Sequence, residues 1–78
     1  MSSKIADLPR FDTGNLRHDA WNRLQILNNL VESGRRNVAD TYLKSFSKTQ
    51  QEDMAEILIR IGDSNYETVH REIMNTIH

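Results

Sequence analysis

The sequence predicts an all-α protein, namely a compact bundle of about four short helices that ends in a helical hairpin. Apolar residues recur every three or four positions through most of the chain, which is the period of one helix face. Capping residues and glycines divide these stretches, and no stretch alternates with the period of two that is typical of a strand. We expect helices at 15–33, 36–46, 48–61 and 65–77, preceded by an irregular N-terminal arm.

The N-terminal arm covers residues 1–14. Pro9 excludes a continuous helix across it, yet Ile5, Leu8 and Phe11 recur at every third position. The favoured interpretation is that the arm folds back and packs on the helices. The alternative is that it docks on a partner, because segments that become ordered on binding often carry such a pattern.

The first expected helix begins at Asn15, a good N-cap residue, and ends before Gly34, which suits the left-handed residue after a helix. Its apolar stripe is Leu16, Ala20, Leu24, Leu27 and Val31. Trp21 lies at one edge of this stripe, so the apolar arc is wide and the helix is predicted to be the central one of the core. Asp19 and Arg23 are spaced i, i+4 and are expected to pair on its flank. The apolar face of the next, shorter helix is Val38, Ala39, Tyr42, Leu43 and Phe46.

The C-terminal hairpin carries the clearest boundary signals. Ser47 and Gln50 form an S-x-x-Q capping box, in which two side chains satisfy free backbone donors in the first turn of a helix. Gly62 can end that helix with a positive φ angle. Ser64 and Glu67 form a second capping box, which is expected to start the last helix. The two facing apolar stripes are Met54, Ile57, Leu58 and Ile61, followed by Tyr66, Val69, Ile73 and Ile77.

The bulk properties limit the class of protein. A chain of 78 residues has room for one small core, and we expect a single helical domain over residues 15–78. Residues 1–39 contain six Lys/Arg and four Asp/Glu, a net charge of +2, whereas residues 40–78 contain four Lys/Arg and seven Asp/Glu, a net charge of −3. This asymmetry is too weak to draw the protein to nucleic acid or to an anionic membrane. No apolar run approaches the roughly 20 residues of a membrane span, and no secretory signal follows Met1. We therefore expect a soluble, cytoplasmic protein without a membrane partner.

Residues that carry chemistry are sparse and scattered. The chain has no cysteine, which excludes disulfides and thiolate ligands. His18, His70 and His78 lack the i, i+3 or i+4 spacing of a helix metal site. His70 and Glu67 share a flank, for which a solvated or half-buried pair is the favoured interpretation over a metal site. Since the glycines also stand alone, no phosphate-binding loop is present. We expect no enzyme, and no catalytic, cofactor-binding or metal-binding residue.

Nucleic-acid binding is the alternative function. A helix-turn-helix unit usually has a small residue four positions before its turn glycine, whereas this chain has Leu30 before Gly34 and Leu58 before Gly62. Arg and Asn can nevertheless read base edges, and a helix N-terminus suits phosphate. Three residues at the start of the second helix are the candidate contacts of a small transcriptional regulator: Arg35, Arg36 and Asn37.

The favoured function follows from surplus apolar surface. The helices carry more apolar positions than one small core requires, and such a surplus usually marks an interface. Leu27 and Ile57 are expected in the core, whereas Ile26, Leu30 and Ile59 are the clearest surplus positions and place the interface on the first and third helices. We predict a small non-enzymatic regulatory or adaptor protein that acts through protein–protein interaction, as a homodimer or with a partner of unknown identity.

Overall fold

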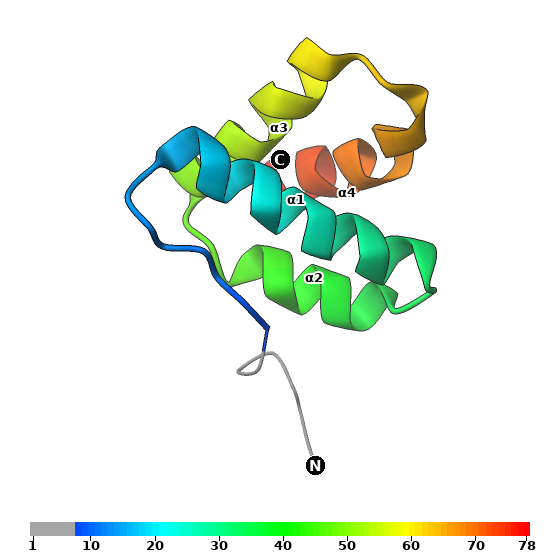
Figure 1. The fold of residues 1–78 in the computed structure, drawn as a ribbon. Coiled ribbons are helices and arrows are strands. Elements are labelled where there is room, and N and C mark those ends of the chain that lie inside the picture. Colours follow the sequence, from blue (N-terminus) through cyan, green and yellow to red (C-terminus); the bar gives the residue numbers. More distant parts are fainter. Residues whose placement is uncertain (1–7) are drawn as a thin grey trace.

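The architecture is a bundle of four α-helices in the computed structural model, which describes residues 8–78 (Figure 1). Their bounds are α1 Leu16–Glu32, α2 Arg36–Lys44, α3 Lys48–Ile61 and α4 Glu67–Ile77. A short 3-10 helix, Ser64–Tyr66, precedes α4, and residues 8–78 contain no strand. The predicted all-α class is confirmed, and each expected helix is present with its ends shifted by at most two residues.

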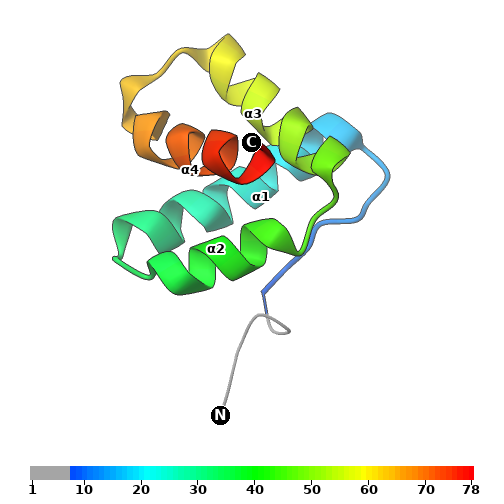
Figure 2. The ribbon, with the colours of Figure 1, turned by 180° about the vertical axis from the view of Figure 1, so that it is seen from behind.

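The first helix, α1, packs against every other helix of the bundle, which accounts for its wide apolar arc. It contacts α2, α3 and α4. The chain runs back from α1 along α2, and α3 and α4 then form the C-terminal hairpin (Figure 1). Figure 2 shows from behind that α4 lies between α3 and the α1–α2 pair, and it contacts all three of these helices. The arrangement leaves one flank of α1 and of α3 beside each other at the surface.

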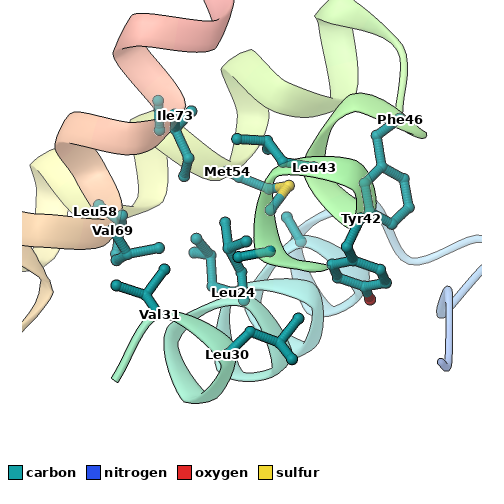
Figure 3. Packing of buried hydrophobic residues seen from close by; sticks show 14 residues of the cluster. Leu24, Leu30, Val31, Tyr42, Leu43, Phe46, Met54, Leu58, Val69 and Ile73 are labelled. Carbon is teal, nitrogen blue, oxygen red and sulfur yellow. The ribbon is translucent and has the colours of Figure 1, made fainter. Parts of the chain in front are cut away.

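All four helices contribute side chains to the core (Figure 3). The largest fully buried apolar side chains are Tyr42, Leu24, Leu27, Leu43, Met54, Ile73 and Val69. Gln51 is also buried, and its amide donates hydrogen bonds to the carbonyls of Leu43 (2.9 Å) and Phe46 (3.1 Å). A polar group can be buried at low cost only when it is hydrogen-bonded in this way. Gln51 therefore fastens the end of α2 to the first turn of α3.

Three predicted helix ends are confirmed. The Asn15 side chain accepts a hydrogen bond from the His18 N–H (3.1 Å), which caps α1. Ser47 and Gln50 make both hydrogen bonds of the capping box at the start of α3 (3.1 and 2.9 Å). Gly62 ends α3 with φ of 64°, a left-handed conformation that glycine adopts without steric cost.

The predicted capping box of Ser64 and Glu67 is wrong. The side chain of Asp63 caps this corner instead, because it accepts a hydrogen bond from the Asn65 N–H (2.9 Å). Ser64 becomes the first residue of the 3-10 helix, and α4 begins only at Glu67, without a side-chain cap. An aspartate one residue earlier can form the same type of local turn, so two candidate caps compete and their sequence pattern alone does not separate them.

The described part of the arm folds back onto the helices, as the favoured interpretation predicts. Leu8 packs against the core, and the Tyr42 hydroxyl donates a hydrogen bond to the carbonyl of Pro9. The Arg10 guanidinium donates to the side chain and the carbonyl of Ser45 (2.7 and 3.1 Å) and stacks over the ring of Phe46. Ile5 lies outside the described residues. The described part of the arm thus contacts both α1 and the end of α2.

The predicted flank pair of Asp19 and Arg23 is also wrong, since both side chains are buried and each holds the arm rather than the other. Asp19 accepts hydrogen bonds from the Thr13 hydroxyl (2.6 Å) and from the N–H groups of Thr13 (2.9 Å) and Gly14 (3.3 Å). The guanidinium of Arg23 donates to the carbonyls of Arg10 (2.7 Å) and Phe11 (3.2 Å), as well as to the carboxylate of Asp12. The two charged side chains thus provide hydrogen-bond partners for backbone N–H and C=O groups of the arm, which lack the partners that a helix or a sheet would give them.

These contacts perturb two ionisable groups. The hydrogen bond from the Thr13 hydroxyl, with the backbone donors of Thr13 and Gly14 and the charge of Arg23, lowers the pKa of Asp19 below 3.8 although burial opposes the shift. Burial raises the pKa of Tyr42 from 10.0 to about 12. Both groups are therefore held in the state that they already have at neutral pH.

Candidate interaction site

A groove runs along the surface between α1 and α3. Its first part, of about 150 Å³, has Leu16 and Ala20 on the α1 side and Asp53 and Glu56 on the α3 side. Its second part, of about 300 Å³, continues between Trp21 of α1 and the last turn of α3. The residues of this second part are Arg17, Trp21, Ile57, Arg60 and Ile61, and Arg17 and Ile57 line both parts. We call the two parts together the α1–α3 groove.

Helix periodicity explains why these residues gather. Arg17 and Trp21 are four residues apart on α1, and Ile57 and Ile61 are four apart on α3, so each pair lies on one helix face. Both pairs flank the buried stripe of their own helix rather than lying on it. The two flanks face the same opening because α1 and α3 are in contact.

The groove exposes large apolar side chains. Leu16 is 69 % exposed and Ile61 is 42 % exposed, whereas Trp21 and Ile57 are half-buried. Ile57 packs against the core without being fully buried, so the prediction that it belongs to the core holds only in part. The predicted stripe positions Leu16 and Ile61 are exposed, so for these two the prediction is wrong. Leu16 and Ile61 sit at the edges of their stripes, where no neighbouring helix among residues 8–78 covers them fully.

The ring of Trp21 is held in place by a neighbouring aromatic residue. Its ring packs against that of Tyr66 at a centroid distance of 6.0 Å and an interplanar angle of 59°. The Tyr66 hydroxyl in turn accepts a hydrogen bond from the Gln25 amide (3.4 Å). An aromatic side chain that is already ordered loses little entropy when a partner covers it.

Charged residues edge the groove at both ends. Asp53 and Glu56 lie beside the part that contains Leu16, whereas Arg60 lies beside the part that contains Ile61. Arg60 makes an exposed i, i+4 ion pair with Glu56 (3.3 Å). Such a pair contributes little to stability, and a partner's carboxylate at Arg60 would compete with Glu56 for the guanidinium.

The structure does not bring the three predicted interface residues together. Leu30 is only 7 % exposed and belongs to the core, and Ile26 is half-buried against it, so neither is surplus surface. Both positions widen the arc of α1 because this central helix has neighbours on several sides. Ile59 is 64 % exposed, as expected, but it lies beside the corner between α3 and α4, away from the α1–α3 groove.

A second hollow of about 280 Å³ lies at this α3–α4 corner, where Ile59, Tyr66 and His70 contribute to its walls. The Nε2 atom of His70 is buried and has no hydrogen-bond partner within residues 8–78. Glu67 also lines the hollow, but residues 8–78 hold no group of three or more His, Asp or Glu side chains placed to bind a metal ion. Apolar side chains such as Leu58 and Ile59 share the lining of this hollow with polar ones such as Asp63 and Glu67.

The residues of the nucleic-acid alternative lie together at the start of α2. Arg35, Arg36 and Asn37 are all exposed. Arg36, however, forms an ion pair with Glu72 of α4, so one of the two candidate cations already has an acidic neighbour. A phosphate would have to compete with that carboxylate for the guanidinium.

Comparison with models of protein families, with curated proteins and with solved structures finds no match to this chain. Across residues 8–78, no helix combines the length and the apolar character needed to cross a membrane.

Sequence reasoning missed the α1–α3 groove although one signal pointed to it. Trp21 lies beside the apolar stripe of α1 rather than within it, and Trp is one of the residue types enriched at the energetic centre of interfaces. The stripe of α3 offers no such signal, because Ile57 and Ile61 fit the core spacing as well as Met54 and Leu58 do. Only the position of α1 against α3 separates the two pairs.

Proposed function

We propose that this chain is a small, cytoplasmic, non-enzymatic regulatory or adaptor protein that acts through protein–protein contact at the α1–α3 groove. One observation carries the proposal: Leu16 and Ile61 are exposed in a single groove. The half-buried side chains of Trp21 and Ile57 line the same groove. Single exposed apolar residues are ordinary on a protein surface, whereas a contiguous group usually marks an interaction site.

Physical considerations support this surface as a binding site. Covering apolar surface is favourable by about 25 cal/mol per Å². Trp and Arg, which are the residue types most often found at the energetic centre of interfaces, occur here as Trp21, Arg17 and Arg60. The groove is formed by two helices that share a packed core, so binding requires little reorganisation of the backbone.

Site-specific photo-cross-linking in cells that express the protein tests this function. A photoreactive amino acid is placed at Leu16 or Ile61, and in matched controls at Ile59, which is as exposed but lies elsewhere, or at Thr41 on α2. We expect discrete protein adducts from the two groove positions and none from the controls. Adducts that form equally from all four positions, or from none, would contradict the proposal.

A further inference from the structure

The charges along the exposed flank of α3 have a definite order. Asp53 and Glu56 lie toward the start of the helix and Arg60 toward its end. Asp53 and Arg60 are seven residues apart, which is nearly two helical turns, so they lie on the same face about 10 Å from each other. With Arg17 opposite, the groove has two acidic and two basic side chains along its edges.

This order determines which partner fits. Along α3, a strongly acidic partner would meet like charge at Asp53 and Glu56 and a strongly basic one at Arg60, and like charges in contact disfavour a complex. The α3 edge of the groove, with Asp53 and Glu56 toward one end and Arg60 toward the other, is instead complementary to its own copy turned by 180°. A two-fold axis makes every such contact twice, since the same patch is used on both subunits.

We propose, on the basis of the interaction function above, that the occupant of the α1–α3 groove is a second copy of this chain. The two-fold axis passes through α3 between Glu56 and Ile57. The two α3 helices cross antiparallel there, and Arg60 of each copy meets Asp53 of the other. Ile57 lies next to the axis and contacts its own counterpart, while Leu16 and Ile61 cover the adjoining apolar surface.

The groove is a small surface for a dimer interface. Stable interfaces use roughly 20–30 residues from each side, and a contact centred on this groove is smaller than that. We therefore expect a reversible dimer in exchange with the monomer. Its population rises with concentration, and so does the melting temperature of the protein, because association stabilises the folded state.

Sedimentation equilibrium of the full chain over a roughly hundredfold range of concentration tests the occupant. We expect monomer and dimer in exchange, and an essentially monomeric protein when Leu16→Lys and Ile61→Lys are combined. Ile59→Lys is the matched control, because Ile59 is also exposed on α3 but outside the groove. Circular dichroism confirms that each variant is folded at a concentration where the wild type is monomeric.

Charge reversal tests the axis. Asp53→Arg and Arg60→Asp should each weaken self-association by roughly tenfold or more at low salt, because like charges then face each other across the axis. An equimolar mixture of the two variants should form a heterodimer, and the double variant should recover the homodimer. Arg71→Asp, an exposed residue of α4 outside the groove, has the same change in charge and should have no effect.

Three outcomes would overturn the dimer: a monomer at every concentration, a dimer that is insensitive to the lysine variants at Leu16 and Ile61, or a mixture of the charge variants that associates no better than each alone. If the wild type is a monomer but the groove positions still form adducts with another protein, the dimer is wrong and the interaction function stands. If the groove positions form no adducts and the wild type is a monomer, both proposals are wrong.

Discussion

At the scale of single residues, the buried ions Asp19 and Arg23 show how an irregular segment can be held in place. The guanidinium of Arg23 binds the successive carbonyls of Arg10 and Phe11, and Phe11 has a φ angle of 58°, in the left-handed region that a bulky side chain rarely adopts. One donor group shared by two consecutive carbonyls requires both to point the same way, which accounts for this conformation. Sequence spacing alone suggested a surface pair, because the carbonyls that recruit Arg23 have no sequence signature.

We predict that Asp19→Asn lowers the melting temperature at neutral pH, because an amide cannot accept all three hydrogen bonds from Thr13 and Gly14. The folded-state pKa of Asp19 lies below its unfolded value of 3.8, so its charge stabilises the fold fully above pH 3.8 and progressively less as the pH falls toward the folded pKa. The difference between wild type and variant should therefore shrink in acid. Thermal melts by circular dichroism from neutral pH to about pH 2 measure it.

A matched carboxylate provides the control for this measurement. Glu52 is exposed on α3, and Glu52→Gln should leave both the melting temperature and its pH dependence close to those of the wild type. A difference between wild type and Asp19→Asn that stays constant down to the lowest pH would contradict the role assigned to the Asp19 charge.

Core and groove positions should respond differently to truncation. Leu27→Ala removes a fully buried side chain and should lower the free energy of unfolding by about 2–5 kcal/mol. Ile57→Ala removes a half-buried one, and its cost should be no more than about 1.5 kcal/mol at concentrations where the chain is monomeric. Urea denaturation measures both values, and an equal loss at the two positions would show that Ile57 is a core residue after all.

At the scale of elements, the helices could be located from the sequence because each boundary has its own local chemistry. Gly34 illustrates this: its N–H donates to the carbonyl of Val31 and the next N–H, of Arg35, to that of Leu30, so the end of α1 is satisfied by a glycine turn. The last boundary was misplaced, since Asp63 and Ser64 are adjacent candidates and the backbone of the corner selects between them. The flanks of the groove were not predictable for another reason. The way two helices cross decides which edge of an apolar stripe a neighbouring helix covers, and the sequence of one helix does not contain that angle.

The two capping assignments give a direct comparison. Ser47→Ala removes a cap whose hydroxyl accepts a backbone hydrogen bond, and it should cost about 1 kcal/mol, or about 4–8 °C in melting temperature for a domain of this size. Ser64→Ala should change the free energy of unfolding by less than about 0.5 kcal/mol, because Asp63 caps that corner. Thermal melts of both variants decide the matter, and a larger loss at Ser64 than at Ser47 would restore the original assignment.

At the scale of the whole molecule, the distribution of charge bears on which partners the protein can attract. The formal net charge is −1, divided into +2 for residues 1–39 and −3 for residues 40–78, so neither part is strongly charged. Arg36 and Glu72 pair across α2 and α4, and Arg60 and Glu56 pair along α3. Such internal pairing reduces the field that steers a highly charged ligand toward a surface.

The nucleic-acid alternative therefore makes a prediction that can fail clearly. We expect no measurable binding of duplex DNA or of RNA at physiological salt. If Arg35 and Arg36 did contact phosphates, the logarithm of the binding constant would fall steeply with the logarithm of salt concentration, and the double variant Arg35→Ala/Arg36→Ala would flatten that slope by about two units. Fluorescence anisotropy titrations at several salt concentrations distinguish the cases. Glu72→Gln is a further test, because it removes the acidic neighbour of Arg36. DNA or RNA binding that appears only in this variant would show that the ion pair suppresses binding. Tight, salt-sensitive binding by the wild type would place the functional surface on α2 instead of the α1–α3 groove.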